Sequence, residues 1–392
     1  MLTLCLLLIL ISFAIAVPAT MAARALGRRM NALDAAGVPG QIKAAPRRVP
    51  NTGGIGIFLA VVIPVLLGLA WIWLMVDNKR DLPAESLEPL RDQFLGIRKQ
   101  TPAAIALVAC VAVLHLLGLL DDRRPLGPYV KLLVMLGISA AAVMFTDSRL
   151  LTMLDARAGG PWLSIVITVL WIGVITNAFN FLDNMDGLSA GVGAICAAFF
   201  LVSALVSPAP QWFVAAMLAL LLGALLGFLV FNFPWRDGKG ASVFMGDGGS
   251  LILGFLLGLL SVRITYVPST SVALTPLPPS PPHAFLILTP LIILAIPLYD
   301  FCSVTLIRLS QGKSPFVGDL RHFSHRLVNH GLSRRAAVLV IYGCTAVTGI
   351  GAVSLPRLSP WQAALVGVQT LLVLCVIALY EWSRRPVEPS GS

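Results

Sequence analysis

An apolar run and the polar stretch that follows it decide the fold of this chain. The run "WLSIVITVLWIGVIT" occupies Trp162–Thr176, and "NAFNFLDNMDGLSAG" follows at Asn177–Gly191. The second stretch places three asparagines and two aspartates directly after the apolar one. Polar and ionisable groups are costly at membrane depth, so they are retained there mainly for function. This arrangement therefore indicates a membrane-spanning helix that ends in a functional site.

The composition is that of an integral membrane protein. The 392 residues are 57% hydrophobic and only 12% charged, with a mean hydropathy of +0.89, whereas a soluble domain carries about 25% charged residues. Eleven apolar stretches are long enough to cross a bilayer as helices. They lie near residues 2–23, 53–76, 102–120, 129–146, 161–179, 187–206, 210–231, 249–266, 283–307, 335–355 and 360–382.

These stretches lack the alternation of apolar and polar residues that a membrane β-barrel requires. We therefore expect an all-α, polytopic membrane helical bundle with about 11 transmembrane helices. Residues 1–392 are expected to form a single membrane domain without a separate soluble domain, and 383–392 a short tail.

The distribution of positive charge predicts the orientation in the membrane. Lys and Arg are retained in cytoplasmic loops, and 19 of the 28 fall on the side that also holds the C-terminus. We therefore expect the N-terminus outside and the C-terminus in the cytoplasm. The net charge of +10 is attributed to this bias and to anionic lipids or substrates, and no nucleic-acid partner is expected.

Acids and amides gather at the ends of several spans on the presumed cytoplasmic face. Asp121 and Asp122 are adjacent, and neighbouring carboxylates repel unless a cation or proton lies between them. Lys131 follows on the same side and suits a phosphate. On a continued helix, Asn177, Asn180 and Asn184 would share a face, with Asp183 beside them. Amide and carboxylate oxygens are the ligands that hard divalent cations prefer.

Two further segments add to this pattern. The stretch "VFMGDGGS" (243–250) places Asp247 in a glycine-rich turn at the start of a span, where free N–H groups favour phosphate oxygens. The loop at 308–335 is basic and contains His322 and His325, which suits a diphosphate. No cysteine or third histidine accompanies this pair, so zinc is disfavoured. Together the segments predict a site for phosphoryl transfer with Mg²⁺ on a lipid substrate.

With these residues in view, the chain resembles the polyprenyl-phosphate N-acetylhexosamine-1-phosphate transferases, the family of WecA, TagO and MraY. Five motifs carry the resemblance, in the family's order, between about Pro46 and Arg335. They are "RRVPNTGG", "GLLDDRRPLGPYVK", "NAFNFLDNMDGLSAG", "VFMGDGGS" and "SPFVGDLRHFSH". The predicted eleven spans and the last motif are closer to the WecA and TagO branch than to MraY.

The resemblance implies an Mg²⁺-dependent enzyme of a bacterial inner membrane with its active site on the cytoplasmic face; Mn²⁺ is expected to substitute. It would transfer a sugar 1-phosphate, most simply N-acetylglucosamine 1-phosphate, from a UDP-sugar to polyprenyl phosphate and release UMP, as the first membrane step of an envelope polysaccharide. A homodimer stays open as the assembly. Transfer of phospho-MurNAc-pentapeptide stays open, as does a cation-coupled transporter whose acids line an ion path.

The resemblance also implies roles for individual residues. Asp121 and Asp122 are the catalytic pair, with Asp121 expected to prepare the lipid phosphate as nucleophile. Asn180 and Asp247 match positions that hold Mg²⁺. Asp183 and Asp186 match the nucleotide pocket, and Phe244 an aromatic residue that stacks on uracil. The remaining predicted substrate-binding residues are Asn177, Lys131, Arg48, Arg321, His322, His325 and Arg326.

The chain departs from the family pattern in three places. Ser324 stands at the middle histidine of a D-x-x-H-x-H-H motif, and Asn184 stands where glycine is usual in "LDNMDG". The segment 232–247 is longer than usual, which weakens the match of Asn232 to a family asparagine. These departures bear on sugar specificity more than on the class of reaction.

Overall fold

The computed structural model describes residues 1–33, 47–77, 84–207, 211–235, 240–265, 287–314 and 321–383, without the side chains of 75–77, 84–97, 99 and 382. The described residues form helices, and their only strand-like pairing is an isolated bridge between Leu33 and Pro50. The helices are α1 (Leu2–Arg29), α2 (Gly54–Asp77), α3 (Ala84–Arg123), α4 (Pro128–Thr146), α5 (Asp155–Ala158), α6 (Trp162–Leu182), α7 (Leu188–Val206), α8 (Trp212–Asn232), α9 (Asp247–Thr265), α10 (Leu288–Ile293), α11 (Ala295–Ser310), α12 (Phe323–Asn329), α13 (Arg334–Ser354) and α14 (Pro360–Ser383).

Ten of the described helices are long and apolar enough to cross a membrane, which confirms a polytopic helical bundle. Ten of the eleven predicted spans match these helices closely. One difference is α3, which begins at Ala84, inside the segment expected to be a loop before the span 102–120. The predicted orientation of the termini stays a prediction. The predicted tail 383–392 lies outside the described residues after Ser383.

The eleventh predicted span, 283–307, is interrupted. Its first residues lie outside the described part of the chain, and the rest forms α10 and α11 with a break at Leu294. Pro297 has no N–H, so the carbonyl of Ile293 loses its helical partner. The thiol of Cys196 on α7 lies 3.4 Å from that carbonyl oxygen and donates to it instead.

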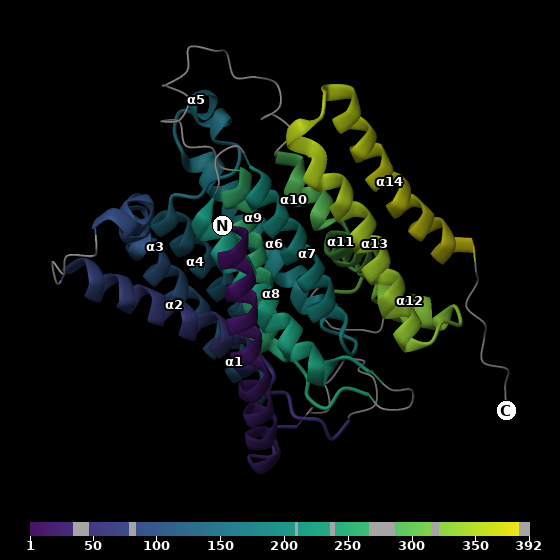
Figure 1. Ribbon diagram of the computed structural model, residues 1–392. Helices are drawn as coiled ribbons and strands as arrows, with labels where there is room; N and C mark the ends of the chain where they lie inside the picture. Colours follow the sequence, from purple (N-terminus) through teal and green to yellow (C-terminus); the bar gives the residue numbers. More distant parts are fainter. Residues whose placement is uncertain are drawn as a thin grey trace, which may run out of the picture.

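Helix α9 lies at the centre of the bundle and packs against α6, α3, α7 and α2 (Figure 1). In its membrane-spanning window 89% of the residues are buried, compared with 17% in α14, which lies on the outside beside α13. Because α9 is buried on nearly all sides, it is mostly apolar, and its charged residues are Asp247 at the beginning and Arg263 near the end.

Close backbone contact brings α3 against the beginning of α9. A Cβ atom at Gly118 would lie 2.3 Å from the backbone nitrogen of Gly248, so only glycine fits at this position. The end of α3, which carries Asp121 and Asp122, is thereby placed beside Asp247 at one end of the bundle.

Candidate active site

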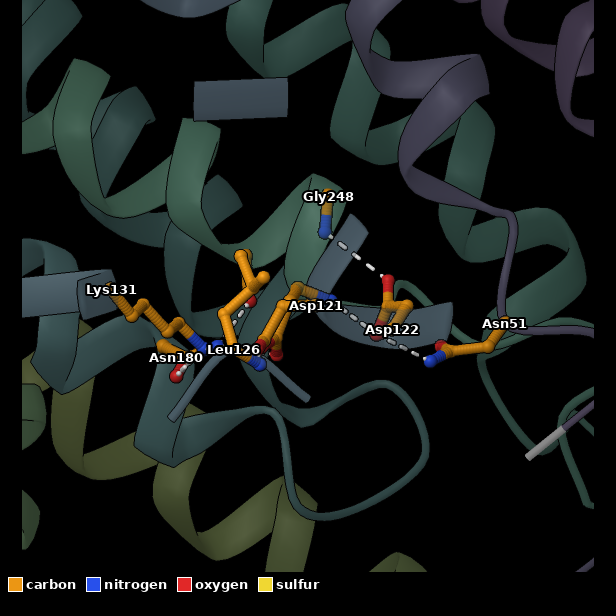
Figure 2. A network of polar contacts seen from close by, with 9 residues as sticks. Asn51, Asp121, Asp122, Leu126, Lys131, Asn180 and Gly248 are labelled. Carbon is orange, nitrogen blue, oxygen red and sulfur yellow. Dashed lines mark hydrogen bonds and ion pairs between the residues drawn. The ribbon is translucent and has the colours of Figure 1, made fainter. Parts of the chain in front are cut away.

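Lys131 lies at the centre of the polar cluster (Figure 2). Its ammonium group donates to Asp121 Oδ2 at 3.3 Å and to Asn180 Oδ1 at 3.1 Å, and it forms a close ion pair with Asp247. These four residues come from α3, α4, α6 and α9. The Lys131 side chain is only 14% exposed, and a charge so enclosed needs several anionic or polar partners. The cluster therefore brings together residues of three of the sequence motifs.

The turn between α3 and α4 brings Lys131 back toward Asp121. Gly127 has φ +83°, a backbone conformation that favours glycine, and Pro128 opens α4. Within this turn the backbone N–H of Leu126 donates to Asp121 Oδ1 at 2.8 Å. One oxygen of Asp121 is thus used to hold the turn, while the other faces the lysine.

Asp122 faces a different set of partners. Its carboxylate accepts hydrogen bonds from the backbone N–H groups of Asp247 at 3.1 Å and Gly248 at 3.4 Å, the first residues of α9. The amide of Asn51 donates to the same carboxylate at 2.7 Å. A carboxylate at these free N–H groups satisfies them and favours the positive end of the helix dipole. Asp122 therefore caps α9 from a neighbouring helix.

Asn180 joins α6 to α9. Its amide nitrogen donates to Asp247 Oδ1 at 2.7 Å and to Ser250 Oγ at 2.9 Å, which turns its oxygen toward Lys131. The expectation that Asn177, Asn180 and Asn184 share one helical face is wrong, because α6 ends at Leu182. Asn177 bonds to the carbonyl of Gly173 within α6, and Asn184 lies in the turn beyond the helix.

Asp183 and Asp186, predicted to line a nucleotide pocket, lie in the turn after α6. Burial first, and then the negative charges of Asp247 and Asp186, raises the pKa of Asp183 to about 8. Asp186 pairs with Arg47, whose Nη1 lies 2.8 Å from Asp186 Oδ2, and it also accepts from the backbone N–H of Ala241 at 2.8 Å.

Phe244 borders the same pair. The guanidinium carbon of Arg47 lies 4.6 Å from the centre of the Phe244 ring, a cation–π contact. Arg48, the arginine predicted to meet phosphate, is exposed, so the structure brings Arg47 rather than Arg48 to the predicted nucleotide residues. The sequence does not distinguish two adjacent arginines, because the local backbone conformation decides which side chain faces inward.

The histidines of the last motif lie on and beside α12. His322 Nδ1 bonds to Asp300 Oδ2 at 2.9 Å, and Asp300 Oδ1 accepts from the backbone N–H of Phe323 at 2.6 Å. Asp300 on α11 is completely buried and was not among the predicted residues. Burial, followed by the charges of His322 and Arg334, lowers the pKa of His325. The motif's Asp319 lies outside the described residues.

The two predicted arginines of this motif bond to protein groups. Arg321 bonds to Gln311, on the short segment after α11. Arg326 donates to Glu381 of α14 at 2.8 Å and to Ser303 at 2.8 Å. Arg326 thus holds α12 against α14, and its predicted contact with a diphosphate stays a prediction.

The donor set around Lys131 fits a hard divalent cation. Within the described residues, no group of three or more His, Cys, Asp or Glu side chains is arranged to hold a metal ion. His322 and His325 therefore belong to no such group. The oxygens of Asp121, Asn180 and Asp247, however, already surround one cation, the lysine ammonium. Two carboxylates and an amide oxygen are suitable ligands for Mg²⁺.

Known proteins resemble this chain in sequence. Residues 104–265 match the family described as glycosyl transferase family 4. A probable undecaprenyl-phosphate N-acetylglucosaminyl 1-phosphate transferase of Bacillus subtilis (strain 168) is 30% identical over 344 residues, 87% of this chain and 82% of the relative. The chain belongs to glycosyl transferase family 4.

Two other relatives of this family-4 chain extend the comparison. A decaprenyl-phosphate N-acetylglucosaminephosphotransferase of Mycolicibacterium smegmatis is 29% identical, over 86% of this chain and 79% of the relative. An undecaprenyl-phosphate alpha-N-acetylglucosaminyl 1-phosphate transferase of Escherichia coli (strain K12) is 28% identical, over 64% of this chain and 65% of the relative. The matched segment 104–265 contains Lys131 and all three of its acceptors.

Sequence reasoning missed three residues that the structure places in or beside the site, namely Asn51, His115 and Asp300, and it chose Arg48 over its neighbour Arg47. His115 Nδ1 bonds to the carbonyl of Gly248 at 2.8 Å, and its ring stacks on Phe58. His115 and Asp300 are ionisable residues inside predicted spans, and that signal could have identified both. Asn51 lies in the quoted "RRVPNTGG" motif, but nothing in the sequence connects it to Asp122.

Proposed function

We propose that this protein transfers N-acetylglucosamine 1-phosphate from UDP-N-acetylglucosamine to a polyprenyl phosphate. The products are polyprenyl-diphosphate-N-acetylglucosamine and UMP. The relatives named above act on undecaprenyl or decaprenyl phosphate, by their names, and this reaction starts a cell-envelope polysaccharide. An undecaprenyl chain is the acceptor we expect.

One observation carries the proposal. Lys131 is enclosed by Asp121, Asn180 and Asp247 at the ends of membrane helices. A lysine beside hard-oxygen ligands is suited to bind a phosphate next to a divalent cation, which is what joining a lipid phosphate to a nucleotide sugar requires. A position at the helix ends allows the acceptor's tail to stay in the bilayer while the donor arrives from water.

The residues then have distinct tasks. Lys131 holds the acceptor phosphate and offsets its charge. Asp121, through the oxygen that faces Lys131, accepts a proton from the acceptor phosphate and orients it for attack on the sugar-linked phosphorus of the donor. Arg47, Asp186 and Phe244 border the place where the nucleotide would bind. The bond from that phosphorus to the UMP oxygen breaks as the new diphosphate bond forms.

We further propose Mg²⁺ as the cofactor, with Mn²⁺ as a substitute. Asp247 and Asn180 would hold the ion, which would supply neutralisation of the donor diphosphate. The excess of Lys and Arg on one side supports a site on the cytoplasmic face of a bacterial inner membrane.

The test uses the purified full-length protein in detergent with undecaprenyl phosphate, radiolabelled UDP-N-acetylglucosamine and Mg²⁺. We expect a lipid-extractable labelled product and an equal amount of UMP, and loss of both in EDTA. Recovery with added Mg²⁺ or Mn²⁺ identifies the cofactor. Full turnover in EDTA would overturn the metal assignment.

Variants tie the reaction to this site. Lys131→Met should lower kcat by at least about a hundredfold, the scale of losing one electrostatic group at the reacting centre. Arg149→Gln is the matched control, because the Arg149–Asp155 pair (2.6 Å) is similarly buried but is formed by residues just beyond the other end of α4. Equal activity in both variants would contradict the assignment of Lys131.

The same assay separates the alternatives. Turnover with UDP-MurNAc-pentapeptide, without turnover of UDP-N-acetylglucosamine, would assign the pentapeptide reaction. Absence of product with every UDP-sugar, together with ion-gradient-driven uptake in vesicles, would favour a transporter.

A further inference from the structure

The two residues that depart from the family motifs contact each other. Asn184 and Ser324 are 140 positions apart, yet Ser324 Oγ donates a hydrogen bond to Asn184 Oδ1 at 2.5 Å. Ser324 is only 1% exposed. The Asn184 amide is oriented by a second bond, from its nitrogen to the carbonyl of Phe181 at 2.8 Å. Its oxygen is therefore directed at the serine.

Each departure is explained by the other. A glycine at position 184 would offer no acceptor, so a buried serine hydroxyl at 324 would lose its partner at a cost. A histidine at 324 would need more volume than serine at a position that is almost fully buried. The asparagine and the serine thus depend on each other for this contact.

This contact joins two parts of the site. Asn184 follows Asp183 directly and lies two residues before Asp186, on the nucleotide side. Ser324 lies between His322 and His325, at the beginning of α12. On its other side, α12 is held by Asp300 through His322 and Phe323. The Asn184–Ser324 hydrogen bond therefore fixes how closely the histidine-bearing α12 lies to the turn after α6.

We propose that the Asn184–Ser324 pair positions His322 and His325 over the donor half of the site and so determines the affinity for the UDP-sugar. The inference rests on the proposed transfer reaction and deepens it. Both residues are positioning residues, since they act through the histidines and the neighbouring acids. The acceptor phosphate, which meets Lys131 and Asp121, is bound independently of this pair.

The kinetic test compares KM values for the two substrates. Ser324→Ala removes the donor of the hydrogen bond, and we expect the KM for UDP-N-acetylglucosamine to rise about tenfold, the scale of one lost buried hydrogen bond. The KM for undecaprenyl phosphate should change less than about twofold. Ser324→Thr keeps the hydroxyl and should restore most of the donor affinity.

Ser310→Ala is the matched control. Ser310 is exposed at the end of α11, and among the described residues its hydroxyl donates within its own helix, to the carbonyl of Ile307. It should leave both KM values unchanged. A rise of both KM values in Ser324→Ala, without rescue by Ser324→Thr, would show a merely structural role and overturn the proposal.

A double substitution tests whether the two positions act as a unit. Asn184→Gly alone strands the serine hydroxyl, and Ser324→His alone forces an imidazole against the asparagine. The double variant has neither a stranded hydroxyl nor an asparagine side chain against the imidazole, so its KM for the UDP-sugar should be closer to wild type than that of either single variant. If the effects of the single variants simply multiply, the positions are independent and the proposal fails.

Hydrogen exchange distinguishes failure of this proposal from failure of the proposed reaction. Backbone amides of 323–329 should exchange faster in Ser324→Ala than in wild type, and as in wild type in Ser324→Thr. This measurement needs no turnover. If wild type makes no product from any UDP-sugar, the proposed function fails, and so does the proposed role of the Asn184–Ser324 pair in UDP-sugar binding. If product forms but exchange is unchanged in Ser324→Ala, only the positioning role fails.

Discussion

Asp121 and Asp122 are consecutive, but their carboxylates bind different groups. One oxygen of Asp121 faces Lys131 at 3.3 Å, whereas Asp122 accepts the backbone N–H groups of Asp247 and Gly248. Successive residues on a helix point about 100° apart, so one acid reaches the lysine while the other reaches the beginning of α9. The structure therefore separates an acid that faces Lys131 from an acid that caps α9.

The first prediction follows from this division. Asp122→Ala should lower the free energy of unfolding by about 1–3 kcal/mol, because two helix N–H groups and the Asn51 amide lose a charged acceptor. Asp121→Asn should abolish turnover with a much smaller change in melting temperature. Thermal unfolding in detergent without Mg²⁺ measures the difference. Equal melting temperatures for Asp122→Ala and wild type would show that Asp122 does not support α9.

The second prediction concerns the two adjacent arginines. Arg47→Ala should raise the KM for UDP-N-acetylglucosamine by about tenfold, because Asp186 and Phe244 both lose a charged partner. Arg48→Ala, at the exposed neighbouring position, serves as the matched control and should change it by less than about twofold. Steady-state kinetics at saturating lipid phosphate provide the comparison. A larger increase in KM for Arg48→Ala than for Arg47→Ala would instead support the predicted phosphate role of Arg48.

The third prediction is a dependence of stability on pH. The pKa of Asp183 is raised to about 8, so the folded protein keeps this proton where the unfolded chain has lost it. Stability contributed by this group is complete at low pH and falls as pH rises between about 4 and about 8. Asp183→Asn removes this titration. In EDTA, the melting temperature of the variant minus that of wild type should therefore increase as pH rises over this range. A constant difference at all pH values would contradict the assignment.

Most of the fold could be predicted because the length of an apolar run is nearly sufficient to define a membrane helix. The predicted span 161–179 became α6 at Trp162–Leu182, with a shift of only a few residues. The break at Leu294 was not predicted, since Pro290 and Pro297 are also compatible with a kinked continuous span. The helical start of α3 was missed because its residues are charged and carry no membrane signal.

The site was predicted in part, and the physical reasons differ. Asp121, Lys131, Asn180 and Asp247 were assigned from motifs, and they meet at one point. The common face of the three asparagines was wrong because a helix periodicity was extended past Leu182. The pairing of Asp300 with His322 was not predictable, because the two residues lie 22 positions apart in the sequence. Contacts between separate segments depend on packing, which local patterns do not contain.

The final prediction concerns α14, which touches the rest of the bundle mainly through α13 and is largely exposed along its length. Glu381 in its last turn accepts hydrogen bonds from Arg326 at 2.8 Å and from the hydroxyl of Tyr299 at 2.7 Å. The carboxylate and the guanidinium are 12% and 15% exposed, so the pair is enclosed enough to contribute measurably. Glu381→Gln and Arg326→Gln should each lower the free energy of unfolding by about 2 kcal/mol.

Because both variants break the same ion pair, the double variant should be hardly less stable than either single one. Loss of this pair should also raise the KM for UDP-N-acetylglucosamine, since Arg326 lies on α12 one residue after His325. Arg149→Gln, which breaks a similarly buried pair outside the site, should lower stability without raising that KM. If Glu381→Gln and Arg326→Gln behave in the same way as Arg149→Gln, then α14 stabilises the bundle but does not influence the site.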